Sequence, residues 1–202
     1  MKATSAFQYP SAPHVRRHGP AGYASVESYR EWLRDEFCFR CVFCLRREQW
    51  GPRTAAFHIE HLVPQKLAPE LAYEYNTHLY ACARCNSVKN ARLRVPDPTV
   101  VAFGQCVRIR SDGQIETLND VGECLVDLLA LDNRDLVQYR RLMLDMLSLL
   151  CRTKRSAYIE WMQFPSDLPD LSSKPAPRNS RPQGITESWF ARKRRGELPD
   201  TY

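Results

Sequence analysis

Apolar side chains recur at helical spacing in two parts of the chain. In "SVESYREWLRDEF", residues 25–37, Ser25 is a typical N-cap residue, and the apolar positions three to four residues apart are Tyr29, Trp32, Leu33 and Phe37. From residue 120 the spacing is helical again, first in "DVGECLVDLLAL" and then from 134 to about 162, where one face carries Leu136, Tyr139, Met143, Met146, Leu147 and Leu150. This pattern predicts an N-terminal helix and a helical C-terminal portion.

Alternating apolar residues predict strands in two other segments. "CVRIRSDGQIETL" has two alternating runs on either side of Asp112-Gly113, which is a strong turn dipeptide, so it predicts a β-hairpin. "FHIEHLVPQ", residues 57–65, begins as a short apolar strand, and Pro64 helps to end it. Together with the predicted helices, these strands indicate a chain of the α+β class.

The two ends of the chain lack such periodicity. Residues 1–24 are rich in Pro, Gly, Ala and His, which predicts a flexible N-terminal arm. Residues 165–202 contain six prolines and the basic run at 192–195, which predicts a loosely ordered, Pro-rich basic tail. Between them we expect a core at 25–95 and a hairpin plus helical region at 96–164.

Composition limits the class of protein. With 202 residues and 44% hydrophobic side chains, the chain can bury a core. The chain contains no uncharged apolar run long enough to predict a membrane span, and its start lacks the apolar segment of a secretory signal. We therefore expect a cytoplasmic protein with no membrane partner. The formal charge of +6 only weakly favours a polyanionic partner.

Eight cysteines in a reducing compartment indicate metal or redox chemistry rather than disulfides. Cys41 and Cys44 form one Cys-x-x-Cys pair in "CVFC", and Cys82 and Cys85 form another in "CARC". Two such pairs can bring four thiolates together in the tetrahedral set of a closed structural zinc site. The sequence therefore predicts a bound Zn²⁺.

Other roles for the cysteines stay open. The four thiols could be buried as small apolar groups. "CFRCVFC" could also belong to an iron–sulfur site, although the further Cys followed by Pro of the ferredoxin pattern is missing. Cys38 is either a spare core thiol or a competitor for one ligand position. The remaining cysteines lie on apolar faces and are predicted to be core residues: Cys106, Cys124 and Cys151.

Three segments in this order, "CVFC", "FHIEHLVP" and "YACARCNSVKNAR", resemble the HNH endonucleases, the His-Me finger nucleases with a zinc-stabilised ββα-metal core. The resemblance extends from about Tyr29 to Arg94. It implies a strand that ends in an acidic residue followed by His, a returning strand, and a helix that opens after a Cys-Asn pair. It also implies metal-dependent hydrolysis of phosphodiester bonds in DNA.

The resemblance implies a role for each matching position. His61 matches the general base, and an imidazole suits proton transfer near neutral pH. Glu60 and Asn86 match the ligands of a catalytic divalent ion, and oxygen donors suit Mg²⁺ or Mn²⁺. Two protein ligands leave positions open for water and the scissile phosphate. On the helix after Asn86, Lys89 and Arg92 are predicted phosphate contacts.

The chain departs from the family pattern at one position. The middle Asn of the family stands five residues before the third zinc cysteine and orders the loop behind the general base, but here Thr77 occupies that place. Asn76 could reach the role, Thr77 could substitute with its hydroxyl, or the site could be impaired. His58 is a structural residue, a third metal ligand or a phosphate contact.

Two alternative functions follow. The first is a nucleic-acid-binding zinc module whose nuclease site has decayed, and Thr77 is the reason for considering it. The second is a nuclease effector subunit of a bacterial defence system that a protein partner activates, which the resemblance permits. The apolar stripe at 134–162 is more typical of a core than of an interface, so it predicts no partner surface.

Overall fold

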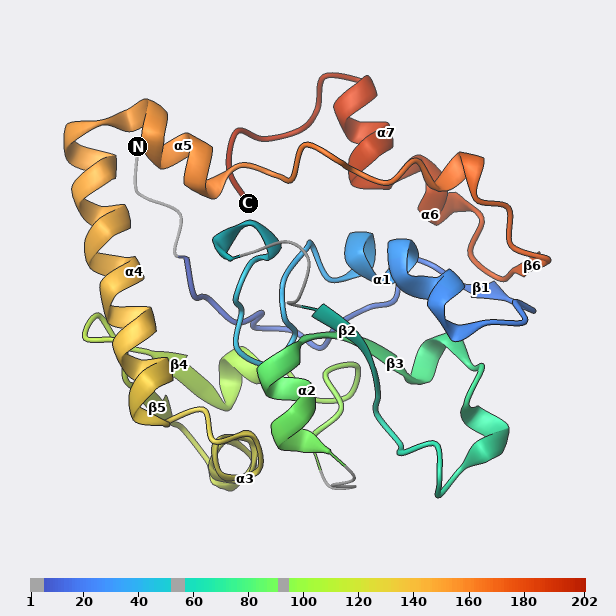
Figure 1. Cartoon of the computed structure of the whole chain (residues 1–202), viewed down its shortest axis with the longest axis horizontal. Coiled ribbons are helices and arrows are strands. Elements are labelled where there is room, and N and C mark those ends of the chain that lie inside the picture. Colours follow the sequence, from blue (N-terminus) through green and yellow to red (C-terminus); the bar gives the residue numbers. More distant parts are fainter. Residues whose placement is uncertain (1–5, 52–56, 91–94) are drawn as a thin grey trace.

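The structure is a computed structural model, and it describes residues 6–51, 57–90 and 95–202 (Figure 1). The described strands form three two-stranded antiparallel sheets. Their pairs are β1 (Pro20–Ala21) with β6 (Arg178–Asn179), β2 (Phe57–His61) with β3 (His78–Cys82), and β4 (Val107–Ile109) with β5 (Ile115–Thr117). The α-helices are α1 (Arg30–Glu36), α2 (Ala83–Lys89), α3 (Asp120–Leu129), α4 (Arg134–Thr153), α5 (Arg155–Met162), α6 (Gln183–Thr186) and α7 (Trp189–Arg194). Small antiparallel sheets beside several helices confirm the α+β class.

The N-terminal helix lies where the apolar spacing predicts it. A 3-10 turn, η1 (Val26–Tyr29), begins after Ser25, whose hydroxyl accepts a hydrogen bond from the Glu27 N–H, and leads directly into α1. Trp32 and Leu33 are completely buried. Because the helix buries this face against β3, it fixes the segment that carries the first two cysteines.

The predicted hairpin is confirmed as β4 and β5 with the turn at Asp112-Gly113. The Asp112 carboxylate accepts a hydrogen bond from the Gln114 N–H, and Gly113 has φ +83°, a conformation that favours glycine. The turn also lies directly against α4, since a Cβ on Gly113 would be 2.5 Å from the Val137 carbonyl oxygen. From α4, the buried Arg140 donates to the Gly113 carbonyl at 2.7 Å and joins hairpin and helix.

The long helix predicted over 134–162 is two helices. The chain leaves helical geometry at Lys154, with φ −147°, and α5 turns away from the end of α4 (Figure 1). The turn brings Tyr158 and Met162 into the core, where they are 1% and 0% exposed. Burial of two large apolar side chains offsets the helical hydrogen bonds lost at the break.

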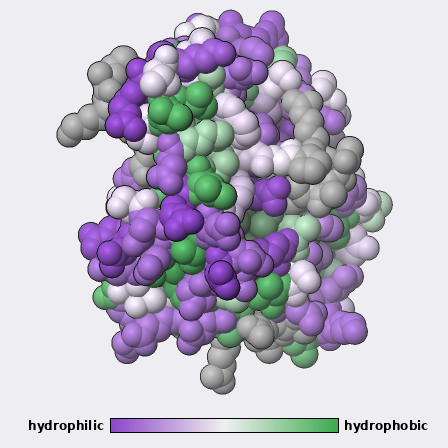
Figure 2. Space-filling model, turned by 60° about the vertical axis from the view of Figure 1, so that its left-hand side comes forward, coloured by the Kyte–Doolittle hydropathy of each residue, from purple (hydrophilic) through white to green (hydrophobic). Residues whose placement is uncertain are grey.

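The apolar stripe on α4 is mostly core, as the sequence predicts. Leu136, Met143 and Leu147 are buried, whereas Leu142 and Leu149 on the outer face are 55% and 54% exposed. On the side of the molecule that carries α4, apolar side chains lie between hydrophilic ones (Figure 2).

The described residues at both ends of the chain are packed rather than loose. The predicted flexible arm at 1–24 is wrong for its described residues, because Phe7 and Tyr9 lie in the main core and β1 pairs with β6. The predicted loose tail at 165–202 is also wrong. Leu171 is buried in the main core, and Tyr202 packs in a second cluster with Phe39, Phe164 and Leu168.

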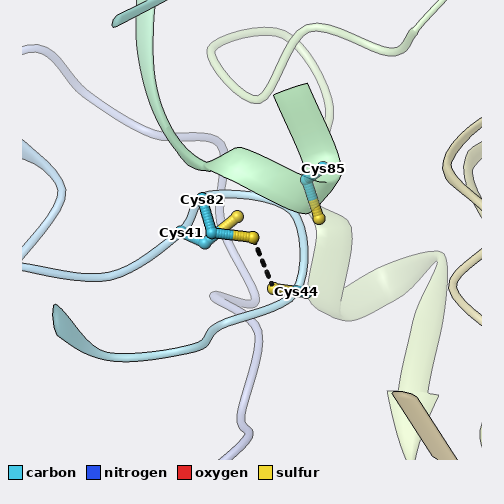
Figure 3. Close-up of side chains that lie close together, drawn as sticks. All are labelled: Cys41, Cys44, Cys82 and Cys85. Atoms are coloured by element: carbon cyan, nitrogen blue, oxygen red, sulfur yellow. Dashed lines mark hydrogen bonds between the residues drawn. The ribbon is translucent and has the colours of Figure 1, made fainter. Parts of the chain in front are cut away.

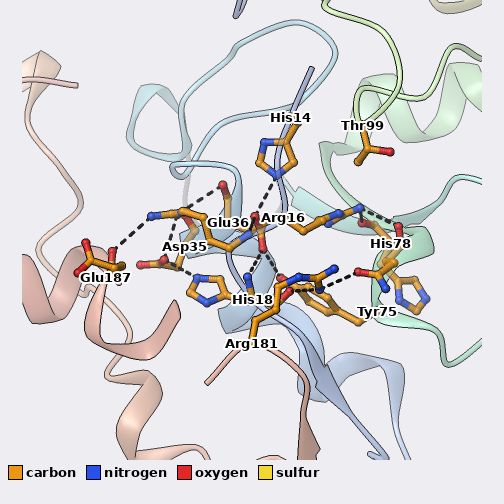
Figure 4. Close-up of polar contacts among 12 residues, drawn as sticks. His14, Arg16, His18, Asp35, Glu36, Tyr75, His78, Thr99, Arg181 and Glu187 are labelled. Atoms are coloured by element: carbon orange, nitrogen blue, oxygen red, sulfur yellow. Dashed lines mark hydrogen bonds and ion pairs between the residues drawn. The ribbon is translucent and has the colours of Figure 1, made fainter. Parts of the chain in front are cut away.

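Two buried carboxylates on α1 hold these ends (Figure 4). The Glu36 carboxylate accepts hydrogen bonds from the His14 ring at 2.9 Å, the backbone N–H groups of Arg17 and His18 at 2.8 and 3.0 Å, and the Tyr75 hydroxyl at 3.0 Å. The residues of the N-terminal segment therefore supply the donors that a buried carboxylate needs.

The neighbouring Asp35 binds both ends at once. Its carboxylate lies 2.8 Å from the His18 ring nitrogen and accepts from the Trp189 backbone N–H at 2.8 Å. Composition alone could not indicate this order, because the partners of Asp35 lie 17 and 154 residues away in the chain.

Acid is expected to destabilise the protein through Glu36. Burial alone would raise the pKa of this carboxyl, but the hydrogen bonds from His14 and the Arg17 backbone, together with the charge of His18, lower it from 4.5 to about 2. The unfolded chain therefore takes up the proton first as the pH falls, so this contribution is complete above about pH 4.5 and is lost towards pH 2. It should decrease by about 2 kcal/mol between pH 6 and pH 3.

Urea unfolding of the wild type and of Glu36→Gln across this range measures the effect. The variant is less stable at pH 6, and the gap to the wild type should narrow as the pH falls. Loss of metal in acid affects both proteins alike and cancels in the comparison. A gap that stays constant down to pH 3 would contradict the prediction.

Candidate functional site

Four cysteines from the two predicted pairs lie together in the interior (Figure 3). Cys41 and Cys44 come from the loop after α1, Cys82 ends β3, and Cys85 lies in the first turn of α2. All four are buried, and their sulfur atoms lie within 4.8 Å of one another, with 3.7 Å between Cys44 and Cys82. Sulfurs around a tetrahedral zinc with bonds of about 2.3 Å lie about 3.8 Å apart. The cluster could therefore hold a metal such as zinc.

The electrostatics of the cluster favour a cation. Hydrogen bonds from the other three thiols lower the pKa of Cys82, whereas burial raises the pKa of Cys41. Four sulfurs in a dry interior cannot all ionise without a positive charge among them. A divalent ion supplies that charge, and the donor set is the one that structural zinc prefers.

Local backbone bonds shape the first cysteine loop. The Leu45 N–H donates to the Cys41 carbonyl at 3.0 Å, and Leu45 itself has φ +62°. The Val42 N–H donates to the Tyr80 carbonyl on β3 at 3.0 Å, so the loop lies against the strand that carries the third cysteine.

The other cysteines lie apart from this cluster. Among the residues that the structure describes, the four-sulfur group does not include Cys38, which packs instead beside the cluster of Phe39 and Phe164. Cys106 is buried in the main core, Cys151 packs against that core, and Cys124 is half-buried.

Arg84, between the second pair of cysteines, has a role that its sequence position does not predict. Its guanidinium donates to the carbonyl oxygens of Leu129 and Ala130 at 3.0 and 2.5 Å. These carbonyls end α3, where the backbone has no helical partners. Arg84 therefore joins the start of α2 to the end of α3.

The strands β2 and β3 form a hairpin that leads directly into α2, and α2 contacts both strands. The register pairs His61 with His78 and Glu60 with Leu79. Because side chains alternate along a strand, Glu60 and His61 leave opposite faces at the end of β2. Lys89 reaches Glu60 from α2, so Glu60 lies on the helix side.

Glu60 is 4% exposed and already binds a cation. The Lys89 ammonium lies 2.7 Å from the Glu60 carboxylate and also donates to the His61 carbonyl at 2.7 Å. Burial raises the pKa of Glu60, although the bond from Lys89 acts in the opposite direction.

Lys89, one of the two predicted phosphate contacts, is not open to a phosphate in this arrangement, because its side chain is completely buried. It lies on the face of α2 that turns towards β2, where its ammonium reaches Glu60. Arg92, the other predicted phosphate contact, lies outside the described residues.

His61 is half-buried on the other face of β2. Its Nε2 atom is buried and has no hydrogen-bond partner among the described residues. Burial lowers the pKa of His61, which favours the neutral imidazole at neutral pH. Its ring packs edge-on against that of His78, with 4.6 Å between the ring centroids.

The sequence did not single out His78 as a site residue. It is completely buried, its Nε2 donates to the Ala72 carbonyl at 3.1 Å, and Arg16 donates to its backbone carbonyl at 2.7 Å. Burial and the nearby His61 lower the pKa of His78 to about 4. It is therefore a neutral, fixed support for the ring of His61.

Thr77, not Asn76, orders the loop that follows β2. The Thr77 hydroxyl donates to the Glu74 carbonyl at 2.8 Å, and the Thr77 carbonyl accepts from the Leu62 N–H at 2.9 Å, directly after His61. The side-chain oxygen of Asn76 instead accepts from Arg181 at 3.1 Å. Asn76 therefore binds the C-terminal segment.

The side chains of Asn86 and His58 are half-buried and exposed, respectively. Asn86 lies one turn before Lys89 on α2, is half-buried, and its side-chain amide has no partner among the described residues. Residues three apart share a helix face, so Asn86 lies on the side of α2 that reaches Glu60. His58 is exposed and leaves the same face of β2 as Glu60.

The chain matches no known family model and no curated protein. Within the described ranges, no helix is long and apolar enough to cross a membrane. What the protein does has therefore to follow from the site itself.

Proposed function

We propose that the protein is a metal-dependent HNH-type endonuclease that hydrolyses phosphodiester bonds in DNA. The observation that carries the proposal is the end of β2, where a cation-binding carboxylate, Glu60, adjoins a neutral imidazole, His61, with an unpartnered nitrogen. The strand belongs to a ββ-hairpin whose following helix begins inside a four-cysteine cluster.

Glu60 and Asn86 would hold the catalytic ion, Mg²⁺ or Mn²⁺. Both supply oxygen ligands, which suit these hard cations. The donor set fits, because Glu60 already binds the positive charge of Lys89 and the Asn86 amide is free of described partners. Bound there, the ion would polarise the phosphate and neutralise the leaving oxygen.

His61 would take the proton from the attacking water. A general base must be unprotonated, and burial keeps the pKa of His61 below its usual range. Because Glu60 and His61 leave opposite faces of the strand end, the base and the ion ligand would lie on different sides of a phosphate bound there. That arrangement suits in-line displacement, in which nucleophile and leaving group lie on opposite sides of phosphorus.

Thr77 supports an intact site rather than an impaired one. The hydroxyl and backbone of Thr77 order the loop that follows His61, which is the role of the family's middle Asn.

The basic run at 192–195 adds less charge than its sequence implies, since Arg192 and Arg195 form ion pairs with Glu187 and Glu197.

One observation favours a second candidate, a nucleic-acid-binding zinc module without cleavage. Lys89 occupies the carboxylate that a catalytic ion would need. If the pair does not open, DNA binds to the protein but is not cut.

Cleavage of supercoiled plasmid by zinc-loaded protein tests the proposal. We expect nicking that requires added Mg²⁺ or Mn²⁺, stops in EDTA, and is lost in Glu60→Gln but retained in the control Glu70→Gln, which changes an exposed carboxylate in the same way. Binding without cutting in every protein would favour the zinc module or a nuclease that needs an activating partner.

A further inference from the structure

A lysine of the chain itself lies against Glu60. The Lys89 ammonium lies between two oxygen acceptors, the Glu60 carboxylate and the His61 carbonyl, each at 2.7 Å. The side chain of Lys89 is completely buried and that of Glu60 nearly so. The Lys89 ammonium, held by these two hydrogen bonds, therefore occupies the side of Glu60 where the proposed site would bind its metal.

We infer that Lys89 is a built-in counter-ion that a divalent metal must displace from Glu60, so that the free protein binds the metal weakly. The inference rests on the proposed function, since it concerns the same carboxylate. It assigns Lys89 to control of metal loading rather than to a phosphate contact on the helix surface.

Charge balance is the physical reason. Glu60 and Lys89 together are neutral, and a divalent ion added beside them leaves two excess positive charges in a poorly solvated place. Like charges near one buried carboxylate repel strongly, because little water screens them. The ion therefore gains the full attraction of Glu60 only when the ammonium has moved away.

The side chain of Lys89 suits a displaceable role. Its ammonium is a point charge on a flexible four-carbon stem, so it can leave an acceptor without a change in the backbone. While it stays, it stabilises a carboxylate that would otherwise be buried without a partner. The metal-free site is then stable and closed.

Mn²⁺ binding to zinc-loaded protein without DNA tests the inference by calorimetry. Lys89→Gln and Lys89→Met should each lower the Kd for Mn²⁺ at least about tenfold, the size expected for loss of one close buried charge contact. The control Lys174→Gln removes an exposed lysine charge and should leave the Kd unchanged. Adding Glu60→Gln to Lys89→Gln should abolish the gain and so assign the ion to Glu60.

A labelling experiment on the wild type requires no substitution. Lys89 should react slowly with acetic anhydride in metal-free solution and faster at saturating Mg²⁺, as mapped by mass spectrometry. Labelling of Lys89 that does not change with Mg²⁺ would overturn the inference even if both lysine variants failed to fold.

The outcomes separate this inference from the proposed function. Equal or weaker Mn²⁺ binding by both folded variants overturns the counter-ion role, while plasmid cleavage by the wild type still upholds the nuclease. Tighter binding by the variants with no cleavage by any protein supports the counter-ion role and contradicts a nuclease that acts without a partner. Absence of Mn²⁺ binding by the variants overturns the counter-ion role, and plasmid cleavage then decides the function by itself.

Discussion

Serine in place of Cys82 is expected to abolish metal binding and to unfold the hairpin and helix around it. Cys82 is the last residue of β3 and the N-cap of α2, and its sulfur lies 3.7 Å from that of Cys44. A structural zinc site contributes about 10–16 kcal/mol in small zinc peptides. That is comparable to the whole stability of a typical domain, about 5–15 kcal/mol.

Metal analysis and thermal unfolding followed by circular dichroism measure this result. Wild-type protein purified under reducing conditions should contain about one zinc per chain. Cys106→Ser is the matched control, because Cys106 is also buried but lies outside the cluster, so that variant should retain its zinc. A wild type without bound metal, or a Cys82→Ser protein with full zinc content, would contradict the prediction.

Alanine in place of His61 is expected to reduce plasmid cleavage about 10²–10⁴-fold, the usual contribution of a general base. His61 is the neutral imidazole at the end of β2 whose Nε2 lacks a described partner. Its removal should leave DNA binding and Mn²⁺ affinity nearly unchanged, because Glu60 and Asn86 supply the proposed ion ligands. The loss should therefore appear in kcat rather than in KM.

Glu70→Gln is the control for this experiment. It changes an exposed side chain in the segment that follows β2, nine residues after His61. Cleavage should survive in Glu70→Gln and fail in His61→Ala, with equal zinc content in both. Equal activity of His61→Ala and the wild type would remove His61 from the mechanism.

Features that depend on neighbouring residues could be predicted from the sequence. Two Cys-x-x-Cys pairs indicate a four-sulfur site because each pair is a local loop with its own preferred geometry. Asp112-Gly113 specifies the hairpin turn, since few residues other than glycine tolerate the positive φ there. The apolar spacing that defines α1 and α3 is equally local.

Other features depend on residues far away in the sequence, and here prediction failed. The ends of the chain have the composition of disordered segments, yet their described residues are ordered, because Asp35 and Glu36 offer buried acceptors to His18 and Trp189. The helix over 134–162 breaks at Lys154, and the turn there brings Tyr158 and Met162 into the core. Neither the acceptors nor the core position is visible in the segments themselves.

The candidate site also combines features that depend on neighbouring residues with features that depend on distant ones. The residue types of the candidate site can be found in the sequence: four cysteines, an acidic residue before a histidine, and an asparagine after the last cysteine. Their environments depend on the fold, which buries Lys89 against Glu60, packs His61 beside His78, and places Thr77 on the loop. Side-chain identity sets what a group can do, whereas burial and distant partners set its charge and its freedom to act.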